Sequence, residues 1–223
     1  MKDDKENENL IIEEKEEIDQ KVLILGNQKV GKSSLIGKAL NTTGEKTNET
    51  FEFHKANDNS NNYTINYQIY EICLTEYAQN LINSFKMGNP IVILVYSIDN
   101  KDSFNNIQNW IYKISDCENI IIVGNKTDLG DNKRVVTEQM LENFFYRYKY
   151  SHLETSAKYG NNVEKLKELL KEIAINRYEE KLRRRRIKST SSMREEKKER
   201  NEVEINKKKQ EEKKECCCKR CFN

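Results

Sequence analysis

A short glycine-containing segment constrains this chain more than any other feature of its sequence. Residues 26–33 read Gly-Asn-Gln-Lys-Val-Gly-Lys-Ser and lie between the apolar run 22–25 and an amphipathic run that begins at Leu35. This order predicts a strand, a tight turn and a helix, in which backbone N–H groups converge on an anion at the positive end of the helix. The predicted phosphate-binding residues are Gln28, Lys29, Val30, Gly31, Lys32, Ser33 and Ser34.

Two residues of this loop carry the expected chemistry. Lys32 is expected at the outer phosphates of a nucleotide, and Ser33 is expected to ligate a magnesium ion. Taken alone, the spacing also fits a plain glycine-containing turn with an exposed lysine. Two later segments favour the nucleotide.

The first of these segments is Asn125-Lys126-Thr127-Asp128, which follows the apolar residues 120–124. The Asp128 carboxylate can accept paired hydrogen bonds from a base with adjacent N–H donors, which guanine has and adenine lacks. The second is Glu154-Thr155-Ser156-Ala157-Lys158, where a backbone N–H can meet the guanine carbonyl oxygen. The predicted guanine-binding residues, which select GTP over ATP, are Asn125, Lys126, Asp128, Ser156, Ala157 and Lys158.

The hydrophobic pattern predicts an α/β fold with a largely parallel sheet, because short apolar runs alternate with helical periodicity. Residues 22–25, 91–96 and 120–123 are nearly continuous aliphatic runs, typical of strands covered on both faces. Residues 51–55 and 63–70 alternate instead and flank a polar loop, which predicts a hairpin at the sheet edge. Helical spacing and apolar character assign the core residues Phe104, Ile107, Trp110, Ile111, Ile114, Met140, Leu141, Phe144 and Phe145.

The three motifs, in this order, resemble those of the small GTPases of the Ras superfamily. The stretch 93–104, Ile-Leu-Val-Tyr-Ser-Ile-Asp-Asn-Lys-Asp-Ser-Phe, followed by Asn109-Trp110, is most similar to the Rab branch. The resemblance covers about residues 20–176. It implies a P-loop NTPase G domain, with a mainly parallel six-stranded sheet and helices on both faces.

The resemblance also implies a function. Such a protein is a monomeric GTP/GDP switch with Mg²⁺ as its cofactor, and it hydrolyses GTP by in-line attack of water. It acts in vesicle and membrane trafficking, through exchange factors, GTPase-activating proteins and effectors that read the switch residues 41–50 and 71–80.

The second switch departs from the family pattern Asp-x-x-Gly-Gln, because this chain has Glu71-Ile72-Cys73-Leu74-Thr75. Glu71 keeps a carboxylate for the water shell of the metal, on a longer arm. Leu74 replaces a glycine whose N–H meets the terminal phosphate, and Leu lacks the conformational freedom of glycine. Thr75 is a weak replacement for the water-positioning glutamine, and Gln28 crowds the path of an incoming arginine.

Guanine binding and efficient hydrolysis are therefore separate predictions. The catalytic residues expected are Thr75 and Lys32, and the metal ligands are Ser33, Thr50 and, through water, Glu71. Thr50 is preferred over Thr47, Thr43 and Thr42 as the residue that senses the terminal phosphate, within a polar loop ordered only by ligand. The alternatives are a GTP-binding scaffold with little or no hydrolysis, and an ATP-using P-loop kinase, against which Asp128 argues.

Charge divides the chain into three parts. Residues 1–20 carry a net charge of −6, residues 21–176 are neutral, and residues 177–223 carry +8. We therefore expect a disordered acidic extension, one G domain, and a basic tail that begins as a solvated helix. No apolar run reaches the roughly 18 residues of a membrane span, and the start lacks the features of a signal peptide, so a cytosolic protein is expected.

The tail ends in four cysteines, Cys216, Cys217, Cys218 and Cys221, which resemble the prenylated twin-cysteine tails of the Rab branch. A lipid combined with basic residues gives stable attachment to a membrane, here the cytosolic face of endomembranes. Cys221 is third from the end, so this is not a C-a-a-X box, and palmitoylation or an unmodified tail stays open. The run 183–186 of four arginines lacks interleaved aromatic residues, so lipid is preferred over nucleic acid.

The isolated residues are assigned no function. His54 and His152 are far in sequence from any nucleophile or second ligand, so each is expected to be a satisfied or exposed side chain. Cys73 and Cys117 are expected to be small buried hydrophobic residues.

Overall fold

The computed structural model describes residues 15–46, 51–60, 62–73 and 78–188. The chain divides into two units, Met1–Ile175 and Asn176–Asn223. The first unit contains the sheet and all the residues of the predicted nucleotide site that the structure describes. In the second, the described residues are helical up to residue 188.

The first unit is built on a seven-stranded sheet in the order β2-β3-β4-β1-β5-β6-β7. β1 pairs in parallel with both β4 and β5, and β6 pairs in parallel with β5 and β7. β3 is antiparallel to both of its neighbours, β2 and β4. The strands are β1 (Glu16–Gly26), β2 (Thr43–Lys46), β3 (Phe51–Asn59), β4 (Tyr63–Cys73), β5 (Ile91–Ser97), β6 (Asn119–Asn125) and β7 (Ser151–Glu154).

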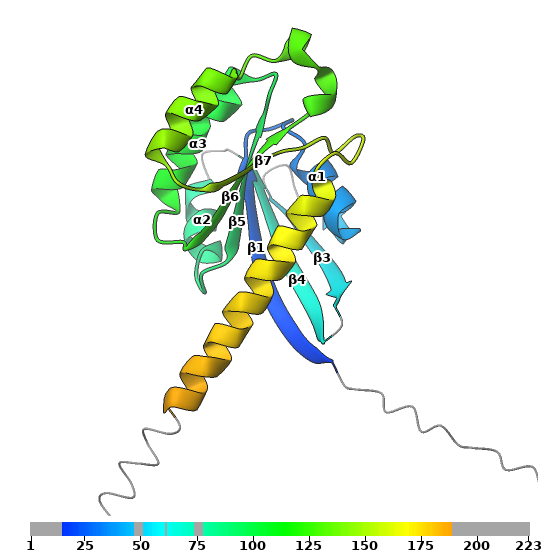
Figure 1. Ribbon diagram of the computed structural model, residues 1–223, viewed down its shortest axis with the longest axis vertical. Coiled ribbons are helices and arrows are strands. Elements are labelled where there is room, and N and C mark those ends of the chain that lie inside the picture. The colour runs from blue at the N-terminus through cyan, green and yellow to red at the C-terminus, as the bar shows by residue number, and fades with distance from the viewer. Residues whose placement is uncertain (1–14, 47–50, 61, 74–77, 189–223) are drawn as a thin grey trace, which may run out of the picture. The chain divides into compact units, whose positions relative to one another are not determined.

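Helices cover both faces of this sheet (Figure 1). On one side lie α2, α3 and α4; on the other lie α1 and the helical residues 163–175 of the first unit. The labelled helices are α1 (Lys32–Leu40), α2 (Ala78–Phe85), α3 (Lys101–Lys113) and α4 (Glu138–Arg147). Side-chain caps fix two of the starts: Asn100 accepts from Ser103 N at 2.9 Å before α3, and Thr137 accepts from Met140 N at 3.3 Å before α4.

The predicted α/β fold and the hairpin are confirmed. Every residue of β5 is buried, as expected for a strand covered on both faces. Trp110 and Phe144 lie in the core that α3 and α4 form with β1, β5 and β6. Met140, Leu141 and Phe145 are only partly buried and pack against its edge.

Two features of the sheet differ from the sequence prediction. It has seven strands and not six, because Thr43–Lys46, within the loop expected to be ordered only by ligand, pairs with β3 as an edge strand. β1 also starts at Glu16, inside the extension predicted to be disordered. Glu16 pairs with Tyr63 at the far end of the long strand β4, and Ile18 points into the core. Backbone pairing does not require an apolar run, so the composition of these segments gave no sign of it.

Several predictions fall outside the described residues: the terminal segments 1–14 and 189–223 with their cysteines, Thr47, Thr50, Leu74 and Thr75. The side chain of Cys73 is not described either, whereas Cys117 is buried. Among the described helices, none combines the length and apolar character that a membrane crossing needs.

Candidate guanine-nucleotide site

The phosphate loop follows β1 at the edge of the sheet where the parallel strands end. Its glycines are required by close packing. A Cβ atom on Gly26 would overlap the carbonyl oxygen of Val95, and one on Gly31, at φ +91°, would lie 2.5 Å from the Asn125 amide nitrogen. The loop is therefore pressed against β5 and β6 and turns directly into α1, where Leu35 N donates to Gly31 O at 2.9 Å. This is the strand, turn and helix that the sequence predicts.

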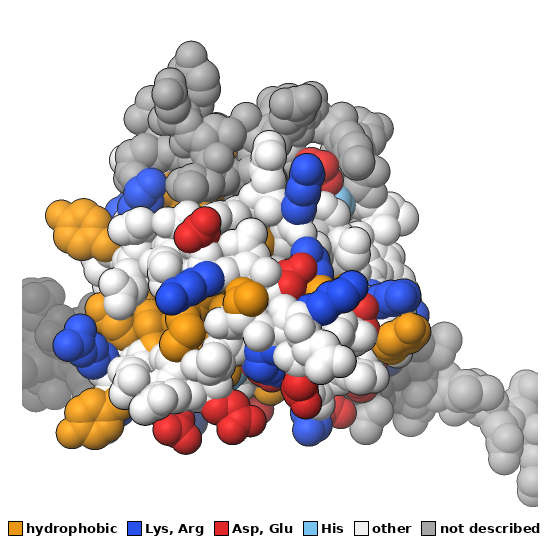
Figure 2. Space-filling view, turned by 90° about the horizontal axis from the view of Figure 1, so that it is seen from above, with side chains coloured by type: hydrophobic (Ala, Val, Ile, Leu, Met, Phe, Trp, Pro, Cys, Tyr) orange, Lys and Arg blue, Asp and Glu red, His pale blue; other side chains and the backbone are white. Residues whose placement is uncertain are grey.

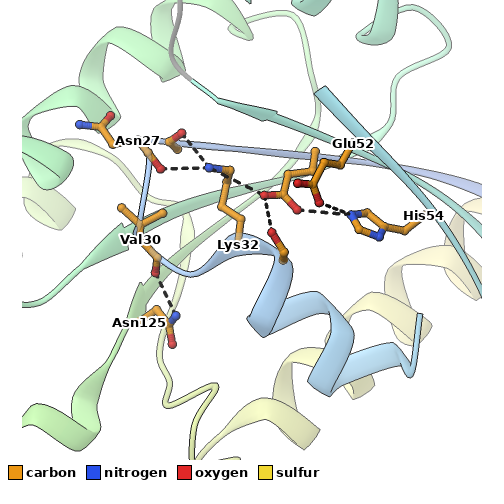
Figure 3. A network of polar contacts seen from close by, with 9 residues as sticks. Asn27, Val30, Lys32, Glu52, His54 and Asn125 are labelled. Atoms are coloured by element: carbon orange, nitrogen blue, oxygen red, sulfur yellow. Dashed lines mark hydrogen bonds and ion pairs between the residues drawn. The ribbon is translucent and has the colours of Figure 1, made fainter. Parts of the chain in front are cut away.

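Lys32 is the first residue of α1 and is almost completely buried, with 3% of its surface exposed. Its ammonium group donates to the carbonyl oxygens of Gly26 at 3.2 Å and Asn27 at 3.0 Å, and it lies 3.9 Å from Glu71 Oε1 (Figure 3). A buried cation is thus held within the loop by carbonyl and carboxylate oxygens.

One side chain connects the phosphate loop to both base loops. Asn125, at the end of β6, donates from Nδ2 to Val30 O at 3.0 Å. Its Oδ1 accepts from Ala157 N at 3.1 Å and from the Thr155 hydroxyl at 3.3 Å. Segments around residues 30, 125 and 157, which are far apart in the sequence, therefore meet at a single buried amide.

The predicted base-recognition residues lie beside this amide. Ser156, which is fully buried, donates from Oγ to Asp128 Oδ1 at 2.6 Å, so one carboxylate oxygen is fixed and its orientation is set. Lys126 has a left-handed backbone, with φ +70°, and its ammonium group lies 3.7 Å from Asp99 Oδ1. Lys158 is exposed, 4.9 Å above the ring of Tyr159. Asp99 was not predicted.

The remaining phosphate-loop residues are divided between surface and core. Gln28, Lys29, Ser33 and Ser34 are exposed, and Val30 is buried. Figure 2 views the molecule from the end at which β1, β5 and β6 finish, and lysine, arginine and acidic side chains are interspersed over the described part of this face. Charge of one sign does not dominate the described part of this face.

Glu71 lies near the end of β4 and faces the phosphate loop, as predicted. Its Oε1 accepts from the Ser33 hydroxyl at 2.9 Å, and only 4% of the residue is exposed. The two oxygen donors expected at a magnesium ion are therefore neighbours, and oxygen is the ligand that Mg²⁺ prefers. The residues fit this ion.

Two functional-site neighbours were missed by sequence reasoning. His54 Nε2 lies 3.4 Å from Glu71 Oε2 and 3.6 Å from Glu52 Oε2 (Figure 3). His54 was expected to be a satisfied or exposed side chain because it is far in sequence from any second ligand, yet it is buried beside two carboxylates. The signal was the register of the predicted hairpin, because Glu52 on β3 pairs directly with Glu71 on β4. Sequence separation says nothing about such a cross-strand contact.

The architecture and the three converging loops define a P-loop nucleotide-binding domain of the α/β class. Comparison with known families agrees: the model of the Ras family matches residues 21–175, and the chain belongs to this family. It is a Rab-like small GTPase, because its curated relatives are Rab proteins.

Three relatives indicate how far the likeness extends. The Ras-related protein Rab-1D of Dictyostelium discoideum is 34% identical over 151 residues, 65% of this chain and 74% of that protein. RABE1e of Arabidopsis thaliana is 32% identical over 153 residues, 66% of this chain and 70% of that protein. RAB1BV of Beta vulgaris is 33% identical over 153 residues, 66% of this chain and 71% of that protein.

Proposed function

We propose that this protein is a GTP/GDP switch that hydrolyses GTP slowly and acts in membrane trafficking. The observation that carries the proposal is the Asn125 amide, which joins the phosphate loop to both base loops. A nucleotide that contacts these loops at both ends binds to a prearranged frame, so little ordering free energy is spent on binding. Membership of the Ras family supports guanine as the base.

Each residue has a task in nucleotide binding. Lys32 exchanges its carbonyl partners for phosphate oxygens, and the N–H groups at the start of α1 face the same anion. Asp128, held by Ser156, accepts hydrogen bonds from the two adjacent N–H groups of guanine. The N–H of Ala157 is the proposed donor to the guanine carbonyl oxygen.

Ser33 and Glu71 are the described residues that would hold a magnesium ion, Glu71 through water. When bound, the ion supplies positive charge that offsets the charge of the phosphates. Thr50 is the proposed third metal ligand and sensor of the terminal phosphate. All three offer oxygen donors, in keeping with the hard character of this ion.

Slow hydrolysis is proposed from the sequence of the second switch. Thr75 has a short hydroxyl where relatives carry a glutamine that orients the attacking water, and Leu74 stands where they carry a glycine. Since an activating arginine contributes about 10³–10⁵ in rate only when these parts are in place, turnover should stay close to the slow intrinsic rate. The protein would then remain loaded with GTP for long periods.

The extensions complete the proposal. Residues 177–223 form a basic tail that anchors the protein through lipidated cysteines to the cytosolic face of endomembranes, and the residues before β1 form an acidic extension. The net charge of +8 on the tail supports attraction to anionic lipid. Exchange factors, GTPase-activating proteins and effectors are the proposed partners of a monomer.

The substitution Asp128→Asn tests base recognition. The amide cannot accept both guanine N–H groups, so GDP affinity should fall by about 10-fold to 100-fold, the equivalent of the roughly 1.5–3 kcal/mol of a charged hydrogen bond. Xanthosine diphosphate, which carries a carbonyl in place of the guanine amine, should bind the variant better than GDP. Asp131→Asn is the matched control, because this carboxylate is fully exposed in a neighbouring turn. If the substitution Asp128→Asn left the affinities for GDP and for ATP the same as in the wild type, the assignment of Asp128 to base recognition would be refuted.

A further inference from the structure

Three side chains beside the phosphate loop form a cluster, which we call the Glu-His-Glu cluster: Glu52, His54 and Glu71. Glu52 and His54 are two residues apart on β3 and therefore lie on the same face, and Glu52 pairs directly with Glu71 on β4. Like charges directly opposite each other in an antiparallel pair are destabilising. A cation between the two strands would offset this repulsion, in addition to the Lys32 ammonium group that lies 3.9 Å from Glu71 Oε1.

The two distances from His54 Nε2 to carboxylate oxygens are longer than hydrogen bonds and match the spacing of two ligands of one metal ion. His54 Nε2 lies 3.4 Å from Glu71 Oε2 and 3.6 Å from Glu52 Oε2. Hydrogen bonds from nitrogen to oxygen fall at about 2.7–3.2 Å. Two ligands of a tetrahedral ion, each at about 2.0–2.2 Å from it, lie about 3.4 Å apart. One ligand atom from each residue falls within 4.8 Å of the others, so a small shift of the side chains would let all three bind one ion.

The burial of two of these side chains strengthens the argument for a bound cation. His54 is 8% exposed and Glu71 is 4% exposed. His54 Nε2 and Glu71 Oε2 are both buried atoms without a hydrogen-bond partner in the part of the chain that the structure describes. Leaving buried polar atoms unpaired is costly, and most are satisfied in folded proteins. A metal ion would satisfy both at once.

We propose that Glu52, His54 and Glu71 bind a divalent first-row transition-metal ion, with Zn²⁺ as the probe. An imidazole nitrogen with two carboxylate oxygens is a ligand set that suits such ions, and it leaves a fourth position for water. Mg²⁺ and Ca²⁺ take oxygen ligands and are not expected here.

The site shares one residue with the nucleotide site and is otherwise separate from it. Glu71 presents Oε1 to the Ser33 hydroxyl and Oε2 to His54. A metal ion in the Glu-His-Glu cluster would therefore hold the carboxylate that faces the phosphate loop. Strands β3 and β4 fix all three ligands, so the site does not depend on a bound nucleotide.

The experiment follows the two histidines of the chain by ¹⁵N NMR. The full chain, loaded with GDP and Mg²⁺, is titrated with Zn²⁺ in a background where Cys216, Cys217, Cys218 and Cys221 are serine, which removes thiolate ligands at the tail. One equivalent of Zn²⁺ should shift the Nε2 resonance of His54 and leave His152 unchanged. His152 is an internal reference, because its Nε2 lies 3.0 Å from the Tyr96 hydroxyl.

Variants separate the proposed ligands from the rest of the surface. His54→Gln and Glu52→Gln should lower Zn²⁺ affinity by more than about 100-fold, above what loss of an orienting group costs. His152→Gln and Glu164→Gln, which alter the same residue types elsewhere, should bind Zn²⁺ like the wild type. Binding that is equally strong in His54→Gln, or a titration that leaves His54 unshifted, would overturn the proposal.

Discussion

Asn125 connects the phosphate loop to the segment that follows β7. Its amide satisfies three groups from two other segments, and the residue is 1% exposed. A buried amide with partners on both ends cannot be replaced by a smaller side chain without leaving a carbonyl and an N–H unpaired. The order of the phosphate and base loops therefore depends on it.

The substitution Asn125→Ala should lower both stability and nucleotide affinity. We expect a loss of about 1–3 kcal/mol in the free energy of unfolding, since buried partners lose their hydrogen bonds. Urea unfolding of nucleotide-free protein and GDP titration measure the two effects. Asn109→Ala removes an exposed hydrogen bond from the Asn109 side-chain amide to Asn106 Oδ1, at 3.2 Å. This control should change neither the free energy of unfolding nor the affinity for GDP. An unfolding free energy unchanged by Asn125→Ala would contradict the proposed role.

At the scale of residues, the sequence predicted the side chains that lie within its three motifs. Asp128, Ser156 and Lys32 were predicted because each lies in a loop after a recognisable apolar strand, and the structure brings these loops together at Asn125. His54 and Glu52 were missed, since their proximity to Glu71 depends on the pairing of two strands. Such contacts depend on register, which apolar patterning leaves open unless the turn is known.

At the scale of elements, β7 shows how a short strand is held in place. Arg134 binds both oxygens of Glu154, at 2.8 and 2.7 Å, and this hydrogen bonding raises the pKa of Arg134. His152 on the same strand lies between the ring of Phe145, 4.4 Å away, and the Tyr96 hydroxyl. Contacts of β7 with residues of β5 and α4 therefore hold in place the base loop that follows β7.

His152 makes stability depend on pH. Burial lowers the pKa of His152 below its ordinary value of 6.5. The unfolded chain therefore takes up a proton before the folded one does, and the free energy of unfolding falls as pH drops below about 6.5, by at most about 1.4 kcal/mol per pH unit. The loss continues until the pH reaches the lower pKa of the folded state.

Comparison with His152→Gln isolates this contribution. The glutamine of the variant cannot be protonated. As pH falls from 7.5 to 5.5, the wild type should therefore lose more unfolding free energy than the variant does. Urea unfolding at several pH values measures the difference. A difference that stays constant over this range would show that His152 is not responsible.

The elements also show where prediction from sequence ends. The strands β1, β5 and β6 and the hairpin β3–β4 were recognised from apolar patterns, as was α3. The edge strand β2 and the first residues of β1 were not recognised, because they are polar and are held by backbone pairing to β3 and β4. Such segments carry no periodic hydrophobic signal.

At the scale of the whole molecule, charge is segregated along the chain. The net charge is −6 over residues 1–20, zero over the G domain and +8 over the tail. A neutral domain can expose switch surfaces to different partners, while a basic tail is suited to anionic membranes. In the function proposed above, nucleotide binding and membrane attachment therefore belong to different parts of the sequence.

Lipidation of the tail is tested by expressing the full chain in eukaryotic cells. Intact mass spectrometry should detect one or two isoprenoid additions, and the protein should fractionate with membranes. Serine at Cys216, Cys217, Cys218 and Cys221 should abolish both, whereas serine at the buried Cys117 should not. An unmodified mass would contradict the proposed anchor, and an acyl addition would identify palmitoylation in its place.

The most direct test of the account is single-turnover hydrolysis of GTP bound to the full chain, with the bound nucleotide identified before and after. We expect GTP to be converted to GDP at about the intrinsic rate of 10⁻⁴ s⁻¹. The double substitution Leu74→Gly and Thr75→Gln should accelerate it. GTP that persists unchanged would make the protein a loaded scaffold, and the absence of any bound guanine nucleotide would contradict the account as a whole.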